Sequence, residues 1–271
     1  MLDVALTGAA GRMGKNLIQA LSDSKELNLV AAIEQSGHPV IGSDAGDIAG
    51  IGTNGIIVTD DLDSVCGSFE ILIDFTIAPS AVENVSICLA NNRKMVIGTT
   101  GLSESEREQV REAAQTIPIV HASNFSVGVN ATFKLAEVAA AILGDSVDIE
   151  ITEVHHRHKV DAPSGTAVTL GEVIAGKLNR DISKVAVYGR EGFTGERDRK
   201  TIGFNSLRGG DIVGEHTVLF AGEGERVEIT HRAQSRMNFA MGALRAAVFV
   251  AGQSSGLFDM QDVLNLRSMG T

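Results

Sequence analysis

The stretch VALTGAAGRMGKNL, residues 4–17, places Gly8, Gly11 and Gly14 after a short β-rich run and at the start of a helical pattern. Glycine lets the backbone turn tightly and approach a ligand closely. The N–H groups and the dipole at the start of a helix favour a bound anion such as a pyrophosphate. We therefore predict the first strand-to-helix turn of a dinucleotide-binding sheet. The alternative is a purely steric turn, because the G-x-x-G-x-x-G spacing departs from the commoner G-x-G-x-x-G fingerprint.

The next strand-like run, NLVAAIE at residues 28–34, ends on Glu34. An acidic side chain at this distance from the glycines can accept hydrogen bonds from both hydroxyls of an adenosine ribose. Gln35 follows and supplies no positive charge for a ribose 2′-phosphate, although Arg12 or Lys15 could supply one from the first loop. We expect NADH as the cofactor, with NADPH as the alternative.

The rest of the first half repeats a strand and helix alternation. Residues 70–75, 94–100 and 118–125 are strand-like, and a helix is expected to begin near residue 78. This order predicts βαβ units with a parallel sheet, in which ligands bind beyond the carboxyl ends of the strands. The turns DFTIAPS and GTTGLS, which follow two of these strands, should therefore lie near the nicotinamide half of the cofactor.

The second half has a different pattern of predicted helices and strands. Residues 131–143 form a helical pattern, and residues 147–154, 201–222 and 225–233 read as strands, with GEGE as a hairpin connection. The last 35 residues return to helical periodicity and could pack on the first domain. These patterns predict an α/β domain followed by an α+β domain.

Composition agrees with two domains, because 271 residues with 44% hydrophobic content bury a large core. A net charge of -11 opposes binding to nucleic acid or to an anionic membrane. Cys66 and Cys88 lack metal-ligand spacing and cannot form a disulfide framework. The N-terminus turns glycine-rich instead of continuing as a signal-peptide core. We expect a cytoplasmic protein without a metal, nucleic-acid or membrane partner.

HHRHK, residues 155–159, is a basic cluster in this acidic chain. Arg157 and Lys159 would repel a metal cation, and a solvated basic loop that offsets Glu150 and Glu153 is the alternative to a ligand site. If the segment continues as an extended strand, the side chains at 155, 157 and 159 share one face and those at 156 and 158 take the other.

The segment after the cluster, DAPSGTAVTLGEVI, reads as the start of a helix, with Pro163 before a cap at Ser164 or Thr166. We expect the N–H groups of Ser164, Gly165 and Thr166 to be free at this helix start. Cations from the loop and amides from the helix could then bind a compact dianion, most simply a dicarboxylate.

Six motifs, in order and over essentially the whole chain, resemble the 4-hydroxy-tetrahydrodipicolinate reductase (dihydrodipicolinate reductase) family of the bacterial diaminopimelate and lysine pathway. They are VALTGAAGRMG, DFT, GTTG, ASNFSVGVN, EVHHRHKVDAPSGTA and HRAQSRMNFA. The resemblance implies a Rossmann-like dinucleotide-binding domain at residues 1–126 and 236–271. It also implies an α+β mixed-sheet substrate-binding and oligomerisation domain at residues 127–235, a homotetramer, and hinge closure around the ligands.

The resemblance also implies an NAD(P)H-dependent oxidoreductase that transfers a hydride to a small cyclic imine dicarboxylate and then protonates the neighbouring carbon. His155 would be the catalytic acid/base and Lys159 the proton donor. The substrate-binding residues would be His156, Ser164, Gly165 and Thr166. The cofactor-binding residues would be Gly8, Ala9, Ala10, Gly11, Arg12, Met13, Glu34, Phe75, Thr76, Gly98, Thr99, Thr100, Ala122, Ser123, Asn124 and Phe125. Many members carry Arg where this chain has Gln35, which weakens the expectation of NADPH use.

Two other functions fit part of the pattern. Another two-domain NAD(P)-dependent dehydrogenase, acting on aspartate or a sugar, would keep the glycine turn without the segment from residue 155 to 166. A non-enzymatic NADH-sensing protein would keep only the first domain.

Overall fold

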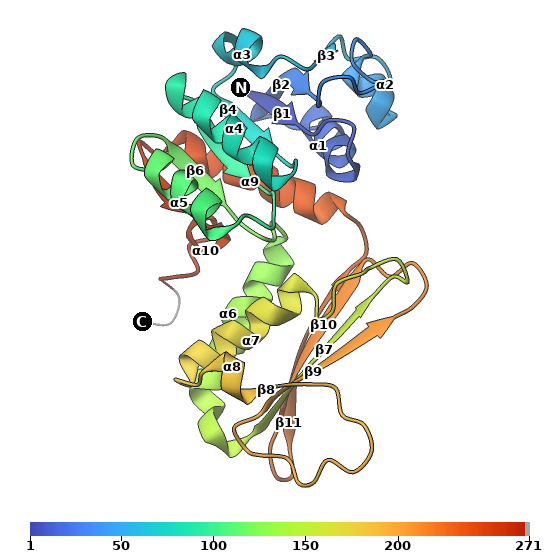
Figure 1. The fold of residues 1–271 in the computed structure, drawn as a ribbon, viewed down its shortest axis with the longest axis vertical. Helices are drawn as coiled ribbons and strands as arrows, with labels where there is room; N and C mark the ends of the chain where they lie inside the picture. Colours follow the sequence, from blue (N-terminus) through green and yellow to red (C-terminus); the bar gives the residue numbers. More distant parts are fainter. Residues whose placement is uncertain (269–271) are drawn as a thin grey trace. The chain divides into compact units, whose positions relative to one another are not determined.

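The computed structural model describes residues 1–268 (Figure 1). The chain divides into two compact units. The first unit comprises Met1–Val127 and Arg236–Arg267, and the second is built on Gly128–Ser235.

The first unit contains a seven-stranded parallel sheet with the order β12-β6-β5-β4-β1-β2-β3. Its strands are β1 (Leu2–Thr7), β2 (Leu27–Ile33), β3 (Val58–Thr59), β4 (Ile71–Asp74), β5 (Lys94–Ile97), β6 (Pro118–His121) and β12 (Gly256–Phe258). The strand order reverses at β1, which is the switch point where doubly wound sheets bind ligands. The Rossmann-like prediction is confirmed.

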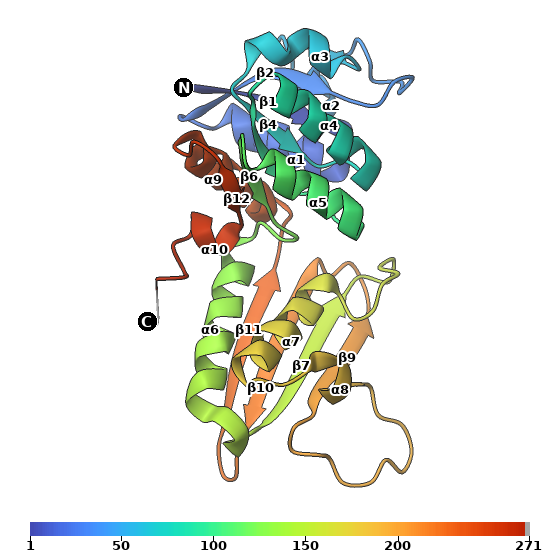
Figure 2. The ribbon, with the colours of Figure 1, turned by 60° about the vertical axis from the view of Figure 1, so that its left-hand side comes forward.

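Helices cover both faces of this sheet (Figure 2). They are α1 (Arg12–Ser22), α2 (Ala45–Ala49), α3 (Leu62–Val65), α4 (Ala78–Ala90), α5 (Glu104–Ala113), α9 (Met237–Ala251) and α10 (Met260–Val263). Successive strand residues point to opposite faces of the sheet, each of which has its own core. Ile71 and Ile73 pack in the core with α1 and α9, and Leu72 packs in the core with α4 and α5. Burial on both faces explains why the strands are apolar runs without alternation.

The C-terminal segment is not helical throughout, so that part of the sequence prediction is wrong. Gly256–Phe258 forms β12, which extends the sheet beside β6 with Leu257 opposite Ile119. Gly256 has a φ of 126°, a conformation that favours glycine. A strand this short carries too few residues to show a periodicity of its own.

The second unit contains a mixed five-stranded sheet with the order β11-β10-β7-β9-β8. Its strands are β7 (Asp148–His155), β8 (Ala186–Tyr188), β9 (Ile202–Arg208), β10 (Gly214–Ala221) and β11 (Arg226–Ala233). The helices are α6 (Val127–Leu143), α7 (Gly165–Lys177) and α8 (Ile182–Val185). The predicted hairpin at GEGE is confirmed, because β10 and β11 pair antiparallel across it with Ala221 opposite Arg226.

Helices α6 and α7 lie on one face of this sheet (Figures 1 and 2). Phe133 and Ala136 of α6, and Leu170 and Ile174 of α7, share one core with the inward residues of the strands. Residues Val127–Ser146 are long and apolar enough to cross a membrane by length and composition alone. Here the apolar residues of α6 contribute to the core of the second unit.

Candidate active site

The glycine turn connects β1 to α1. A Cβ on Gly8, whose φ is 79°, would lie 2.5 Å from the carbonyl oxygen of Phe75. A Cβ on Gly14 would collide with the carbonyl oxygens of Gly8 and Ala9. Within the described residues no side chain caps the start of α1, where Gly11 is the N-cap. The turn is therefore held close to β4 by its glycines, and it leaves the helix start suited to an anion.

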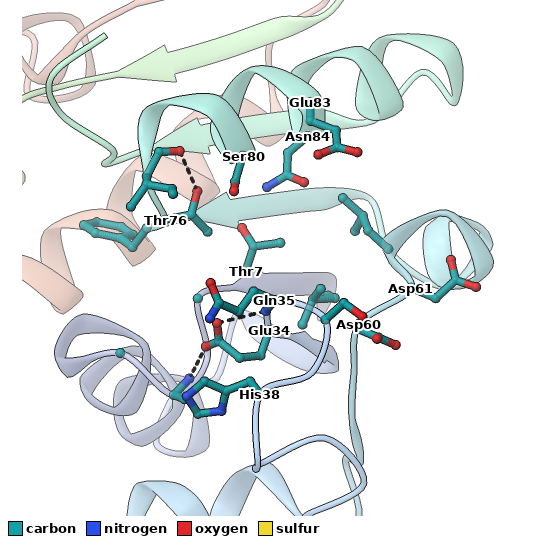
Figure 3. Close-up of a pocket in the computed structure, with 18 of the residues that line it drawn as sticks. Thr7, Glu34, Gln35, His38, Asp60, Asp61, Thr76, Ser80, Glu83 and Asn84 are labelled. Carbon is teal, nitrogen blue, oxygen red and sulfur yellow. Dashed lines mark hydrogen bonds between the residues drawn. The ribbon is translucent and has the colours of Figure 1, made fainter.

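A cavity of about 950 Å³ opens beside this turn (Figure 3). Its size matches cofactor sites in proteins. Of the predicted cofactor residues, those that line it are Gly8, Ala10, Gly11, Glu34, Phe75 and Thr76. Glu34 is fixed there, because its Oε2 accepts a hydrogen bond from the Ala10 amide at 2.9 Å and its Oε1 accepts one from the Gln35 amide at 2.9 Å. The carboxylate predicted to bind a ribose therefore lies in the cavity, beside the glycine turn.

The rim of the cavity is acidic. Besides Glu34, the lining includes Asp60, Asp61, Asp63 and Glu83, and none of its described residues is Lys or Arg. Arg12 and Lys15 are exposed and do not line it. Sequence reasoning missed these acids because they follow β3, a two-residue strand that shows no pattern, or lie within α4.

A buried carboxylate beneath the cavity connects three strand ends. Asp74, at the end of β4, is fully buried and accepts hydrogen bonds from Thr7 at 2.9 Å, Thr99 at 2.6 Å and Asn84 at 2.6 Å. The Thr76 amide in turn donates to Thr99 Oγ1 at 2.9 Å. This network joins β1, β4, α4 and the turn after β5. It positions Thr76, which lies at the edge of the cavity (Figure 3).

The remaining predicted cofactor residues lie outside this cavity lining, near the ends of α1, β5 and β6. They are Ala9, Arg12, Met13, Gly98, Thr99, Thr100, Ala122, Ser123, Asn124 and Phe125. The rings of Phe75 and Phe125 pack with centroids 5.6 Å apart. A Cβ on Gly98 would collide with the Phe75 ring, so glycine at this position gives the ring its room.

In the second unit, β7 ends at His155, so the condition for sorting the basic cluster onto two faces, an extended strand to residue 159, is not met. Pairing with β9 stops at His155 and Arg208, after which β9 gives way to Gly209 and Gly210. The His156 amide still donates to the Ile212 carbonyl at 2.8 Å, but the chain then turns, and the Lys159 amide donates to the His156 carbonyl at 3.1 Å. The expected sorting of the basic cluster onto two faces therefore does not occur.

His155 lies on the helix-covered face of β7, together with Glu153. Its Nδ1 is 2.5 Å from Glu153 Oε2, and its ring meets the His216 ring edge-on with centroids 5.1 Å apart. A Cβ on Gly214 would lie 2.9 Å from His155 Nε2, so glycine at the start of β10 leaves space for the imidazole. His155 is thus a packed side chain with a fixed ring.

The charges around His155 set its protonation. Burial lowers the pKa of His155, Glu153 opposes that shift, and Lys159 and Arg208 reinforce it. Burial would raise the pKa of Glu153, but hydrogen bonds from Arg208 and His155 outweigh it and bring that pKa to about 2. At neutral pH a permanent carboxylate therefore faces the imidazole.

The start of α7 differs from the sequence prediction at Ser164. The Ser164 amide, expected to be free, donates to Glu153 Oε1 at 3.2 Å. The Ser164 hydroxyl caps the helix by accepting from the Ala167 amide at 3.2 Å, and it lies 2.8 Å from His216 Nε2. Ser164 is 2% exposed, so it is buried within the protein and supports the site structurally. Gly165 and Thr166 are the first helical residues of α7.

The other basic residues lie in the turn after β7. Lys159 Nζ forms an ion pair with Asp161 Oδ1 at 2.9 Å, and the Lys159 side chain is 20% exposed. His156 lies 6.1 Å from His158 between ring centroids, and Arg157 and His158 are exposed. Within residues 1–268, no cluster of His, Cys, Asp and Glu is arranged to hold a metal ion.

His216 makes stability depend on pH. Burial, with a smaller contribution from His155, lowers its pKa to about 3. Below about pH 6.5 the unfolded chain binds a proton here that the folded chain does not bind, so stability falls as the pH drops through this window. From pH 7 to 5 the loss from this group is on the order of 2 kcal/mol. We expect His216→Gln to lose less stability over that interval in urea unfolding.

The matched control for this prediction is His158→Gln, which removes an exposed histidine. It should keep the pH dependence of the unmodified protein. An equal loss of stability between pH 7 and 5 in His216→Gln and the unmodified protein would contradict the prediction.

Family models for the dihydrodipicolinate reductase N-terminus and C-terminus match residues 2–125 and 128–264. The chain belongs to the dihydrodipicolinate reductase family. It is therefore an oxidoreductase that reduces 4-hydroxy-tetrahydrodipicolinate in diaminopimelate and lysine biosynthesis, and its first unit is the NAD(P)H-binding domain. The two alternative functions considered from the sequence gain no support from these matches.

Solved structures agree with the family. The dipicolinate-bound dihydrodipicolinate reductase from Paenisporosarcina sp. TG-14 is 25% identical, with a TM-score of 0.77, over 97% of this chain and 98% of that one. GenD2 from gentamicin A biosynthesis, in complex with NAD, is 16% identical with a TM-score of 0.60, over 100% of this chain and 88% of that one. Scyllo-inositol dehydrogenase from Lactobacillus casei is 14% identical with a TM-score of 0.61, over 98% and 94%. The last two share the fold alone.

Proposed function

We propose that the chain carries out its reduction with NADH in preference to NADPH. The observation that carries this proposal is the acidic cavity rim. A 2′-phosphate placed beside Glu34 would meet Asp60 and Asp61 without a Lys or Arg among the described lining residues. A ribose diol, by contrast, can donate hydrogen bonds to the remaining lone pairs of Glu34.

The residues at the cavity fit a dinucleotide. The uncapped start of α1 suits its pyrophosphate, and Glu34 suits its ribose. Phe75, Gly98 and Phe125 supply an apolar surface at the carboxyl ends of β4, β5 and β6, where we place the nicotinamide half. When bound, the nicotinamide supplies a hydride.

We place the substrate at the turn after β7 and the start of α7. The Paenisporosarcina relative was solved with dipicolinate, a planar cyclic dicarboxylate. Two elements that can each bind a carboxylate, the basic turn after β7 and the start of α7, suit such a ligand. The proposed contacts are His156, Lys159, Gly165 and Thr166. Ser164 is proposed to hold the helix start instead of binding the substrate itself, because its hydroxyl and amide are both engaged.

We assign proton transfer to His155 and Lys159. His155 is held by Glu153 and is neutral at pH 7, because burial lowers its pKa. Lys159 lies in the same turn, and its ammonium can both neutralise a carboxylate and donate a proton. Together, neutral His155 and the Lys159 ammonium provide a general base and a general acid at the proposed anion site.

A direct assay tests this function. The freshly made condensation product of the pathway aldehyde with pyruvate is supplied to the enzyme, and the loss of NADH absorbance is followed. Pyridine-2,6-dicarboxylate should inhibit competitively against the substrate. Absence of both turnover and inhibition would refute the assigned substrate site.

We expect Gln35→Arg to shift cofactor preference toward NADPH by about tenfold, because one charge-assisted hydrogen bond to the 2′-phosphate is worth about 1.4 kcal/mol. Equilibrium fluorescence titration of both cofactors measures this shift. Gln109→Arg is the matched control, since it adds the same charge at an exposed position on α5 away from the cavity. Tighter binding of NADPH than NADH by the unmodified protein would contradict the proposed preference.

We also propose a cytoplasmic homotetramer. The face of the five-stranded sheet opposite α6 and α7 carries outward residues such as Leu207, which lies opposite Val154 in the sheet and is 49% exposed. A second copy of the chain could cover this face. Sedimentation analysis tests the assembly, and a monomer at micromolar concentration would refute it.

A further inference from the structure

We infer that Glu153 is a positioning residue that fixes the tautomer of His155, so that only Nε2 exchanges a proton with the substrate. The same carboxylate also fixes the start of α7. This inference rests on the proposed role of His155, but the tautomer itself can be measured without turnover.

Hydrogen-bond donors surround both carboxylate oxygens of Glu153. Its Oε2 lies 2.8 Å from Arg208 Nη1 and 2.5 Å from His155 Nδ1. Its Oε1 accepts from Arg208 Nη2 at 2.8 Å and from the Ser164 amide at 3.2 Å. Glu153 is 1% exposed. Each oxygen is therefore used twice, and Arg208 forms a bidentate pair with the carboxylate.

These contacts determine which ring nitrogen of His155 carries the proton. An ionised carboxylate only accepts hydrogen bonds, so the short contact requires a proton on Nδ1. The low pKa of Glu153 keeps this true throughout the physiological range. In neutral His155 the lone pair therefore lies on Nε2, which has no hydrogen-bond partner among the described residues. Proton uptake and release then occur at Nε2.

The other oxygen of Glu153, Oε1, positions the start of α7, the helix proposed to bind the anion. By accepting from the Ser164 amide, Glu153 ties the N-cap of α7 to β7. Ser164 caps the helix with its hydroxyl and contacts His216 from β10. One buried charge thus orients both the proton-transferring ring and the helix start proposed to bind the substrate.

The charges that face this pair come from several elements. Arg208 approaches from β9, His216 from β10 and Lys159 from the turn after β7. Of the groups that act on His155, Glu153 raises its pKa, while Lys159 and Arg208 lower it. Removing the charge of Glu153 should therefore lower the pKa of His155 further.

The test is Glu153→Gln, which keeps the shape of the side chain. If its oxygen stays on the Ser164 amide, its NH₂ group faces His155 Nδ1 and forces the proton to Nε2. We expect kcat to fall about 10- to 10³-fold. The limb of the pH–rate profile that belongs to His155 should move to lower pH. NADH affinity should stay within twofold, because the cofactor cavity lies in the first unit.

Glu150→Gln is the matched control. Glu150 is on the same strand and is also paired with arginines, Arg190 at 2.8 Å and Arg197 at 3.0 Å. It lies on the opposite face of β7 from His155. This variant removes an arginine-bound carboxylate equally, and it should keep kcat and the pH profile.

Nitrogen-15 NMR of the histidine rings in the unmodified protein gives a readout that depends neither on activity nor on the folding of Glu153→Gln. The His155 signals are assigned by their loss in His155→Gln. The unmodified protein should show a protonated Nδ1 at neutral pH, and the opposite tautomer would overturn the inference. If His155→Gln is impaired while Glu153→Gln matches Glu150→Gln, the inference fails and the proposed function stands. Full activity of His155→Gln would instead refute the proposed proton-transfer role of His155.

Discussion

Replacing His155 by Gln should lower kcat roughly 10²- to 10⁴-fold, the usual contribution of general acid/base catalysis. Glutamine fills much of the same space beside Gly214 and can still form a hydrogen bond to Glu153, but it cannot exchange a proton near neutral pH. NADH affinity should be nearly unchanged, because the cavity that contains Glu34 lies in the first unit. Steady-state kinetics and cofactor titration measure the two effects separately.

His158→Gln is the matched control for this variant, because it makes the same exchange three residues further along, in the turn that follows β7. His158 is exposed, and it occupies the variable position of the H-H-R-x-K motif. It should be nearly neutral. Equal losses in the two variants would indicate that the cluster acts through its summed charge and not through proton transfer at His155.

Features of the candidate site that are local along the chain could be predicted from the sequence. The glycine turn, Glu34, and the order of basic loop and helix start can each be read within a short window. Each lies at the end of a strand or at the start of a helix. The spacing of these residues along the chain therefore determines their position in space. The parallel sheet then brings the turns after β1, β4 and β5 to one edge.

The support of the site was not predictable in this way. Arg208 lies 55 residues beyond Glu153, and His216 lies 52 residues beyond Ser164. Both meet β7 only because β9 and β10 flank it in the sheet, and that strand order leaves no periodic trace in the sequence. Alternation along β7 does place Glu153 on the same face as His155, which is the signal that could have linked them.

The end of β7 depends on a neighbouring strand. An isolated view of residues 148–159 favours one extended segment, with Lys159 on the face of His155. The partner β9 ends at Arg208, and the chain closes a turn at Arg157 and His158. Lys159 therefore reaches the site from a turn, where Asp161 pairs with it.

That arrangement makes Lys159 the second position with a large expected effect. Lys159→Met should lower kcat about 10- to 10³-fold and should also raise KM, because it removes both a proton donor and a cation that faces a carboxylate. Steady-state kinetics over a range of substrate concentrations separate the two parameters.

Two further variants identify the cause of the Lys159→Met defect. Asp161→Asn breaks the same ion pair while leaving the ammonium in place, and since Asp161 is 57% exposed the pair itself should contribute little. We expect its kcat to stay within about fivefold of the unmodified protein, since exposed pairs are worth at most about 1 kcal/mol. Lys159→Arg keeps the charge, but a guanidinium remains protonated and is a poor acid. It should therefore restore much of KM without restoring kcat. Recovery of both parameters in Lys159→Arg would show that residue 159 only binds the carboxylate, and that the proton comes from His155 or from solvent.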